Sequence, residues 1–280
     1  MPYTFRHAIC NEVFKDWDFA KACTTIRNAG YTGIEIAPFT LAEKPTDVSA
    51  QQRREYRSII EESGLDFVGL HWLMVSPPGL HVTTPDDALR KRSWQHIHDL
   101  IDLCADLGPS GVMVFGSPQQ RRTTGGLSRE EATRNYVNGL AEAAPHARNR
   151  GVTILMEALP VGQSDVVQSL DEAVKLVAEI GSPAVQTMFD THNAVDEVES
   201  HAELVDRHIG VIRHVHVNEM DGSHCGVGDY DFKPVLAVLK QRNYAGWVSL
   251  EAFDFAAGAE NIANGSLRYL ESEIERLPNE

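Results

Sequence analysis

The chain has 280 residues, of which 42% are hydrophobic and 23% are charged, a composition typical of a folded globular protein rather than a disordered one. Its 25 Lys and Arg residues against 40 Asp and Glu residues give a net charge of −15. A surface this acidic repels the phosphate backbone of nucleic acids, so we expect neither DNA nor RNA as a partner.

Short apolar runs alternate with helical patterns along the whole chain. Most of these runs are rich in Val, Ile, Leu and Met and lack polar alternation, as expected for strands that are buried on both faces. Eight strands are predicted, at residues 3–9, 33–37, 66–71, 111–115, 152–157, 185–190, 212–217 and 247–251.

A helical pattern follows each predicted strand. Glycines stand where several of these helices end, and Ser128 with Glu131 forms a capping box at the start of another. The helices are predicted near residues 18–29, 48–63, 85–107, 128–150, 169–180, 199–209, 232–242 and 258–276.

Eight repeats of strand and helix predict an α/β fold, namely a single (β/α)8 TIM barrel that occupies residues 1–280 as one domain. The alternative is an open doubly wound sheet. Such a sheet usually carries a glycine-rich nucleotide loop after its first strand, and the sequence has none there.

The sequence shows no feature of an exported or membrane protein. Its N-terminus lacks a basic segment followed by an apolar stretch, and no apolar run approaches the roughly 20 residues of a membrane span. The four cysteines show no CxxC spacing and are too few for a disulfide framework. We therefore expect a cytoplasmic protein with reduced thiols and no membrane partner. We also expect it to assemble as a homo-oligomer, either a dimer or a tetramer.

Four polar residues, Glu157, Asp190, His216 and Glu251, end the last four predicted strands. In a barrel of parallel strands such residues converge at one mouth, where these folds keep their active sites. Each carboxylate alone is more simply explained as a helix cap or a salt bridge, and Asp190 is placed to cap a turn. Three carboxylates and one imidazole together require a cation, so the set predicts a metal site.

This ligand set favours one hard or borderline divalent ion, Mn²⁺ first, with Mg²⁺ or Co²⁺ as alternatives and Zn²⁺ less favoured. Such a site leaves positions open for two adjacent substrate oxygens. A metal ion there would polarise a carbonyl group and stabilise the enediolate that forms when the neighbouring carbon loses a proton. Glu157 and Glu251 are then available as acid and base.

At these residues the chain resembles the xylose isomerase-like TIM barrel superfamily, and within it the sugar phosphate isomerase/epimerase family that includes the ketose 3-epimerases. The resemblance implies that Glu157 and Glu251 serve both as metal ligands and as the proton-transfer pair, one on each face of the substrate. It also implies that His192 contacts a substrate oxygen near the carbonyl. The matching segments are ILMEALP, MFDTHN, HVHVNE and VSLEAF, which contain the four predicted ligands.

Two positions depart from the ketose 3-epimerase pattern. Residues 158–164 contain no acid where those enzymes place a glutamate, and residues 217–225 contain no arginine. The loop at 226–232 is similar to that of hydroxypyruvate isomerase-like and inosose dehydratase-like members. Its alternative interpretation is a glycine turn that caps the next helix through Asp231.

Further substrate contacts are predicted near the same mouth. Glu35 and His71 lie toward the same end of the second and third strands. A role in supporting the site explains these two residues as well as substrate contact does. Trp72 either forms a wall of a sugar pocket or packs in the core. The pair Arg121-Arg122 is better explained as solvated charges than as a phosphate site. The predicted substrate-binding residues are His192, His71, Glu35, Glu219 and Trp72.

These observations favour a metal-dependent isomerase or epimerase that acts on a small keto-sugar, a carbohydrate, by proton transfer next to its carbonyl. The alternative is a lyase or dehydratase with the same site, either inosose dehydratase-like or eliminating 3-keto-glycosides. A phosphodiesterase similar to endonuclease IV would need more histidine ligands and a basic surface, which the charge of −15 does not provide. A sugar-binding barrel without activity is disfavoured because both proton-transfer glutamates are present.

Overall fold

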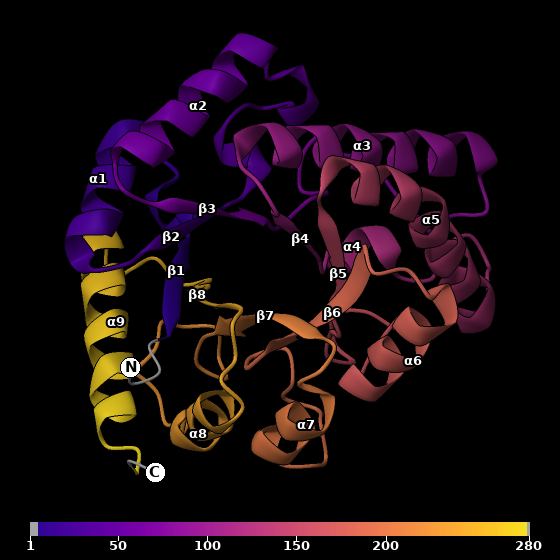
Figure 1. The fold of residues 1–280 in the computed structure, drawn as a ribbon. Coiled ribbons are helices and arrows are strands. Elements are labelled where there is room, and N and C mark those ends of the chain that lie inside the picture. The colour runs from indigo at the N-terminus through magenta and orange to yellow at the C-terminus, as the bar shows by residue number, and fades with distance from the viewer. Residues whose placement is uncertain (1–4, 279–280) are drawn as a thin grey trace.

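A computed structural model describes residues 5–278, and in it eight parallel strands form a closed barrel in chain order, with β1 paired to β8. Figure 1 shows this barrel with the helices arranged around it. The predicted (β/α)8 barrel is confirmed. The strands are β1 (Arg6–Cys10), β2 (Gly33–Ile36), β3 (Asp66–Leu70), β4 (Val112–Phe115), β5 (Thr153–Met156), β6 (Val185–Asp190), β7 (Ile212–Val217) and β8 (Trp247–Leu250).

The helices follow the predicted order. In Figure 1 the last helix lies beside the first, so both ends of the described chain meet where the barrel closes. The helices of the described residues are α1 (Phe19–Ala29), α2 (Ala50–Glu62), α3 (Asp87–Leu107), α4 (Pro118–Arg121), α5 (Arg129–Arg150), α6 (Leu170–Ile180), α7 (His201–His208), α8 (Lys233–Gln241) and α9 (Ala259–Glu275).

Some short elements differ from the prediction. The first strand begins at Arg6 and ends at Cys10 instead of spanning 3–9, and residues 3 and 4 lie outside the described residues. The single turn α4 was not predicted, because four residues carry no readable helical period. The same is true of three 3₁₀ turns, η1 (Asn11–Phe14), η2 (Pro38–Thr40) and η3 (Pro45–Asp47).

Local signals explain where the longer helices begin and end. The predicted capping box is present: the Ser128 side chain accepts from the Glu131 backbone N–H, and the Glu131 carboxylate accepts from the Ser128 N–H at 2.8 Å. The same helix, α5, ends at Gly151, whose φ of 71° lies in the left-handed region that glycine adopts without strain.

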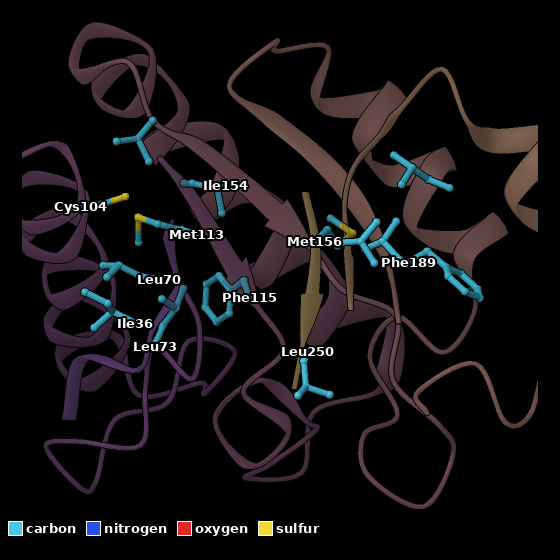
Figure 2. Packing of buried hydrophobic residues seen from close by; sticks show 14 of the residues in the cluster. Ile36, Leu70, Leu73, Cys104, Met113, Phe115, Ile154, Met156, Phe189 and Leu250 are labelled. Atoms are coloured by element: carbon cyan, nitrogen blue, oxygen red, sulfur yellow. The ribbon is translucent and has the colours of Figure 1, made fainter. Parts of the chain in front are cut away.

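The two-residue period of the strands decides which side chains enter the barrel. Figure 2 shows Met113 and Phe115 of β4 and Ile154 and Met156 of β5 among the side chains that pack in the hydrophobic core. Because strand residues alternate in direction, the residue after Met156 turns toward the barrel interior. Polar residues at such inward positions near the ends of β5 to β8 therefore converge on the barrel axis.

Candidate metal centre

The structure brings the four predicted ligands together. Glu157, Asp190, His216 and Glu251 are all buried, and each offers a ligand atom that lies within 4.8 Å of the others. All four residues that precede them, Met156, Phe189, Val215 and Leu250, belong to the hydrophobic core, and Figure 2 labels three of these, Met156, Phe189 and Leu250. The alternating direction of side chains along each strand therefore orients the carboxylates toward one point.

A neutral donor holds one oxygen of each carboxylate. Asn193 Nδ2 donates to Glu157 Oε1 at 2.9 Å, the Asn193 backbone N–H donates to Asp190 Oδ1 at 2.7 Å, and Trp72 Nε1 donates to Glu251 Oε1 at 2.8 Å. The second oxygen of Asp190 lies 3.5 Å from both Asn218 Nδ2 and His216 Nδ1, and the second oxygen of Glu251 lies 3.1 Å from His216 Nδ1. These contacts fix the carboxylates without neutralising them.

His216 is oriented from both sides of its ring. Its Nε2 lies 3.1 and 3.2 Å from the two Glu35 oxygens, and its Nδ1 lies 3.1 Å from Glu251 Oε2 and 3.5 Å from Asp190 Oδ2. A hydrogen at Nε2 satisfies Glu35 and leaves a lone pair on Nδ1. An imidazole whose second nitrogen donates to a carboxylate is the usual arrangement for a metal-binding histidine.

Each carboxylate of the cluster opposes the ionisation of its neighbours. Burial, and then the charges of Asp190 and Glu251, raise the pKa of Glu157 from 4.5 to about 8. Burial also raises the pKa of Glu251 despite the opposing effect of His216. Buried carboxylates that repel one another resist ionisation, and a divalent cation bound between them compensates their negative charge. The donor set therefore fits one divalent ion.

A cavity of about 350 Å³ opens beside the cluster, and both Glu157 and Glu251 line it. The predicted substrate contacts Trp72 and His192 also line it. Trp72 stacks with Phe39 and with Phe253, at ring-centroid distances of 5.8 and 5.9 Å, and these contacts restrict the orientation of its indole ring.

The other three predicted substrate contacts lie elsewhere. Glu35 and His71 have no exposed surface and do not line the cavity, and His71 Nε2 pairs with the buried Glu12 at 2.7 Å. Glu219 accepts from the backbone N–H groups of Gly226 and Tyr230, so it organises the loop after β7. Their positions support a structural role beneath or beside the site rather than contact with a ligand in this cavity.

The loop at 226–232 also contains the predicted cap. Asp231 Oδ1 accepts from the Lys233 backbone N–H at 3.2 Å, just before α8. Asp231 thus binds the first N–H of the helix, as the simpler interpretation of the loop predicts, but the N-cap residue is Phe232, whose side chain makes no capping hydrogen bond.

Several cavity residues were not predicted from the sequence. Ser117, Gln163, Asn193 and Phe253 all line the cavity. Asn193 had a readable signal, because it lies three residues after the predicted ligand Asp190 on a tight turn. The other three lie on loops whose paths are set by tertiary contacts, so spacing alone does not indicate them.

The interpretation of Arg121 as a solvated charge is wrong. The residue has no exposed surface, and its guanidinium donates to the carbonyl oxygens of Phe115 at 2.9 Å and Val167 at 3.5 Å. It also lies over the ring of Tyr136. Arg121 thus ties the loop after β4 to the loop after β5 and is not available to a ligand.

A family model described as a xylose isomerase-like TIM barrel matches residues 23–273. The chain belongs to this family. An L-ribulose 3-epimerase of Mesorhizobium japonicum is 24% identical to this xylose isomerase-like barrel over 255 residues, which are 88% of this chain and 79% of that protein. An inosose dehydratase of Clostridium beijerinckii is 26% identical over 264 residues, covering 85% of this chain and 83% of that protein.

Solved structures show the same fold. A crystal structure of D-psicose 3-epimerase in the presence of D-fructose has a TM-score of 0.82 at 17% identity, covering 96% of this chain and 99% of that one. Within residues 5–278 of this family member, no helix combines the length and apolarity needed to cross a bilayer.

Proposed function

We propose that the protein is a divalent-metal-dependent sugar isomerase or epimerase that moves a proton on the carbon next to the carbonyl of a small keto-sugar. The observation that carries the proposal is the cluster of three buried carboxylates and one imidazole at the wall of a cavity that Glu157 and Glu251 share. Relatives named as an L-ribulose 3-epimerase and a fructoselysine 3-epimerase support it.

Glu157, Asp190, His216 and Glu251 would hold the ion, with Mn²⁺ favoured over Mg²⁺ and Co²⁺, and Zn²⁺ last. When bound, the ion supplies Lewis acidity, which makes the hydrogen next to a ketone more acidic. The remaining chemistry belongs to side chains of the chain itself.

Glu157 and Glu251 are the groups placed to transfer the proton. Both line the cavity, and burial raises the pKa of each toward the range in which a carboxylate can accept and return a proton near neutral pH. Asn193 and Trp72 fix one oxygen of each, which limits the directions in which they can reach the substrate. One glutamate removes the proton; its return by the other gives an epimer, and its return to the neighbouring carbon gives an isomer.

A lyase is the second candidate, and the inosose dehydratase relatives favour it. The same glutamates could remove the proton, after which a hydroxyl group on the next carbon leaves as water. The two candidates share their first step, the removal of the proton. They differ in whether the product retains all the oxygen atoms of the substrate.

Deuterium incorporation tests both candidates. We expect the Mn²⁺-loaded protein in D₂O to exchange a carbon-bound hydrogen of keto-sugars such as L-ribulose or of an inosose, detected by NMR. Exchange without loss of water supports the isomerase or epimerase, and loss of water supports the lyase. Absence of exchange with every keto-sugar would contradict both.

The variant Glu251→Gln is expected to lose exchange by at least about a hundredfold, because an amide cannot accept the proton. Glu260→Gln, at an exposed position of α9, is the matched control and should keep full activity. Full activity in Glu251→Gln would show that this carboxylate has no role in proton transfer.

We also propose a cytoplasmic location and assembly as a dimer or tetramer. The burial of all four cysteines supports the first, since it suits thiols that stay reduced. Light scattering on the purified protein tests the second.

A further inference from the structure

We propose, building on the function proposed above, that the substrate is an uncharged keto-sugar without a phosphate group, and that Gln163 selects it by binding one of its hydroxyl groups. The proposal rests on the charges around the cavity and on the hydrogen-bonding groups that line it. It concerns the end of the substrate that lies away from the metal ligands.

Apart from the proposed metal ion, the described residues that line the cavity offer no cationic side chain to an anionic substrate. Among the described residues, none of those that line it is Lys or Arg, whereas Glu157 and Glu251 are both there. Arg121, on the adjacent loop, is buried and bound to backbone carbonyls, and Arg122 donates to Gln119 Oε1 at 3.2 Å without lining the cavity. A phosphate dianion here would meet like charges in a poorly hydrated space.

The single turn α4 borders the cavity and begins with Pro118, which has no N–H to donate to a phosphate. The other exposed residues of the rim carry no charge. Val75 and Phe253, which are 50% and 37% exposed, are apolar, and Gln119 and Gln120 are neutral amides. A rim of apolar and uncharged side chains does not favour a group that carries two negative charges.

The polar groups that do line the cavity suit hydroxyl groups. His192 Nδ1 lies 2.8 Å from the Met220 carbonyl oxygen, which can only accept, so Nδ1 carries the hydrogen and Nε2 carries a lone pair. Ser117 Oγ lines the cavity and is buried without a hydrogen-bond partner. A sugar hydroxyl can donate to Nε2 and accept from Oγ, whereas a phosphate dianion cannot donate.

Gln163 lies at the centre of this set. Its Nε2 donates to Asn193 Oδ1 at 3.2 Å and lies 3.5 Å from His192 Nε2. By donating to Oδ1, it leaves Asn193 Nδ2 free to donate to Glu157. A carboxylate at position 163 would face the Asn193 oxygen and add a fourth negative charge near the cluster.

The amide of Gln163 therefore has two effects. It keeps Asn193 in the orientation that holds the Glu157 carboxylate, and it presents its uncharged carbonyl oxygen to the substrate as a hydrogen-bond acceptor. Residues 158–164 contain no acid, and Gln163 is the residue of this segment that supplies a hydrogen-bonding side chain to the cavity together with Asn193 and His192.

Paired ligands test the proposed substrate class. The Mn²⁺-loaded protein is titrated calorimetrically with L-ribulose and L-ribulose 5-phosphate, and with D-fructose and D-fructose 6-phosphate, and the same pairs are used for hydrogen exchange in D₂O. We expect the neutral member of a pair to bind at least tenfold more tightly and to exchange faster.

Tighter binding or faster exchange of a phosphate ester would overturn this inference but leave the proposed function standing, because exchange itself reports proton transfer. If no neutral or phosphorylated keto-sugar binds or exchanges, both fail.

The variant Gln163→Leu tests the residue. We expect KM for the neutral ketose that exchanges fastest to rise about tenfold, the usual effect of losing one hydrogen bond of about 1.4 kcal/mol. Its kcat and its affinity for Mn²⁺ should fall as well, because Asn193 loses the contact that orients it toward Glu157. Gln51→Leu, at an exposed position of α2, is the matched control with wild-type KM. An unchanged KM in Gln163→Leu would overturn the role of Gln163.

Discussion

Glu35 is the residue on which the orientation of His216 depends. Its oxygens accept from His214 Nε2 at 2.8 Å and from His216 Nε2 at 3.1 Å, in a location with no exposed surface. Burial opposes its ionisation, but His214 and His216 outweigh burial and hold the pKa of Glu35 well below its usual value. A permanently ionised acceptor fixes the hydrogen of His216 at Nε2 and keeps Nδ1 available to an ion.

The variant Glu35→Gln should weaken metal binding without touching a ligand. The amide keeps the volume, but its NH₂ group competes with the imidazole donors, so we expect Mn²⁺ affinity to fall about 10- to 100-fold. Competition with a chelating dye measures this. Glu62→Gln, at an exposed position of α2, should bind Mn²⁺ like the wild type. Equal affinities for the two variants would show that Glu35 does not position His216.

At the scale of elements, the backbone at the end of β4 lies so close to the Glu157 carboxylate that a side chain at this point of the backbone would collide with it. A Cβ atom added at Gly116, directly after β4, would lie 2.2 Å from Glu157 Oε2. This approach lets the first predicted ligand, at the end of β5, sit against the neighbouring backbone. The glycine is therefore required by contact and not by its φ angle.

The variant Gly116→Ala should displace the Glu157 carboxylate. We expect Mn²⁺ affinity to fall about tenfold or more, the effect of an overpacked site that costs 1–3 kcal/mol. Isothermal titration calorimetry measures it. Gly210→Ala, where an added Cβ has no neighbour within 4 Å, serves as the control. Unchanged affinity in Gly116→Ala would mean that Glu157 has room to move without loss of binding.

The longer elements could be predicted because their signals are local. The strands are apolar runs, the helices have periodic faces and caps, and the four cluster residues are the inward positions that end β5 to β8. The environment of Arg121 could not be predicted, because its carbonyl partners lie 6 and 46 residues away. The same holds for Gln163, whose partners lie on the loop after β6.

For the whole molecule, the crowded carboxylates make stability depend on pH. The folded protein binds a proton at Glu157 up to about pH 8, whereas the unfolded chain releases it near 4.5. His216, whose pKa is raised by Glu35 and Glu251 against the effect of burial, acts in the same direction. At these two groups the folded state holds more protons than the unfolded state, so their contribution to stability falls as pH rises through this range.

We expect the metal-free protein to lose about 1–2 kcal/mol of unfolding free energy between pH 6.5 and pH 8 from Glu157 alone. Near pH 6.5 a histidine with a lowered pKa, such as His7 at about 4, acts in the opposite direction, because its imidazole in the unfolded chain is still partly protonated there. The contribution of Glu157 is therefore the difference in pH dependence between the wild type and Glu157→Gln, measured by urea unfolding in EDTA. Mn²⁺ should remove this difference because the ion replaces the proton. The same pH dependence in the wild type and in Glu157→Gln would contradict this.

The two halves of the barrel contribute differently to the centre. Every predicted ligand lies on or directly after one of the strands β5 to β8, whereas Glu35 lies on β2 and Trp72 follows β3, and these two residues hold His216 and Glu251. Sequence drift in the first half of the chain can therefore retune ion preference or reactivity while all four coordinating side chains stay the same. Barrels of this family with the same four ligands can therefore differ in metal or reaction through residues such as Glu35 and Trp72, which would touch the ligands and not the ion.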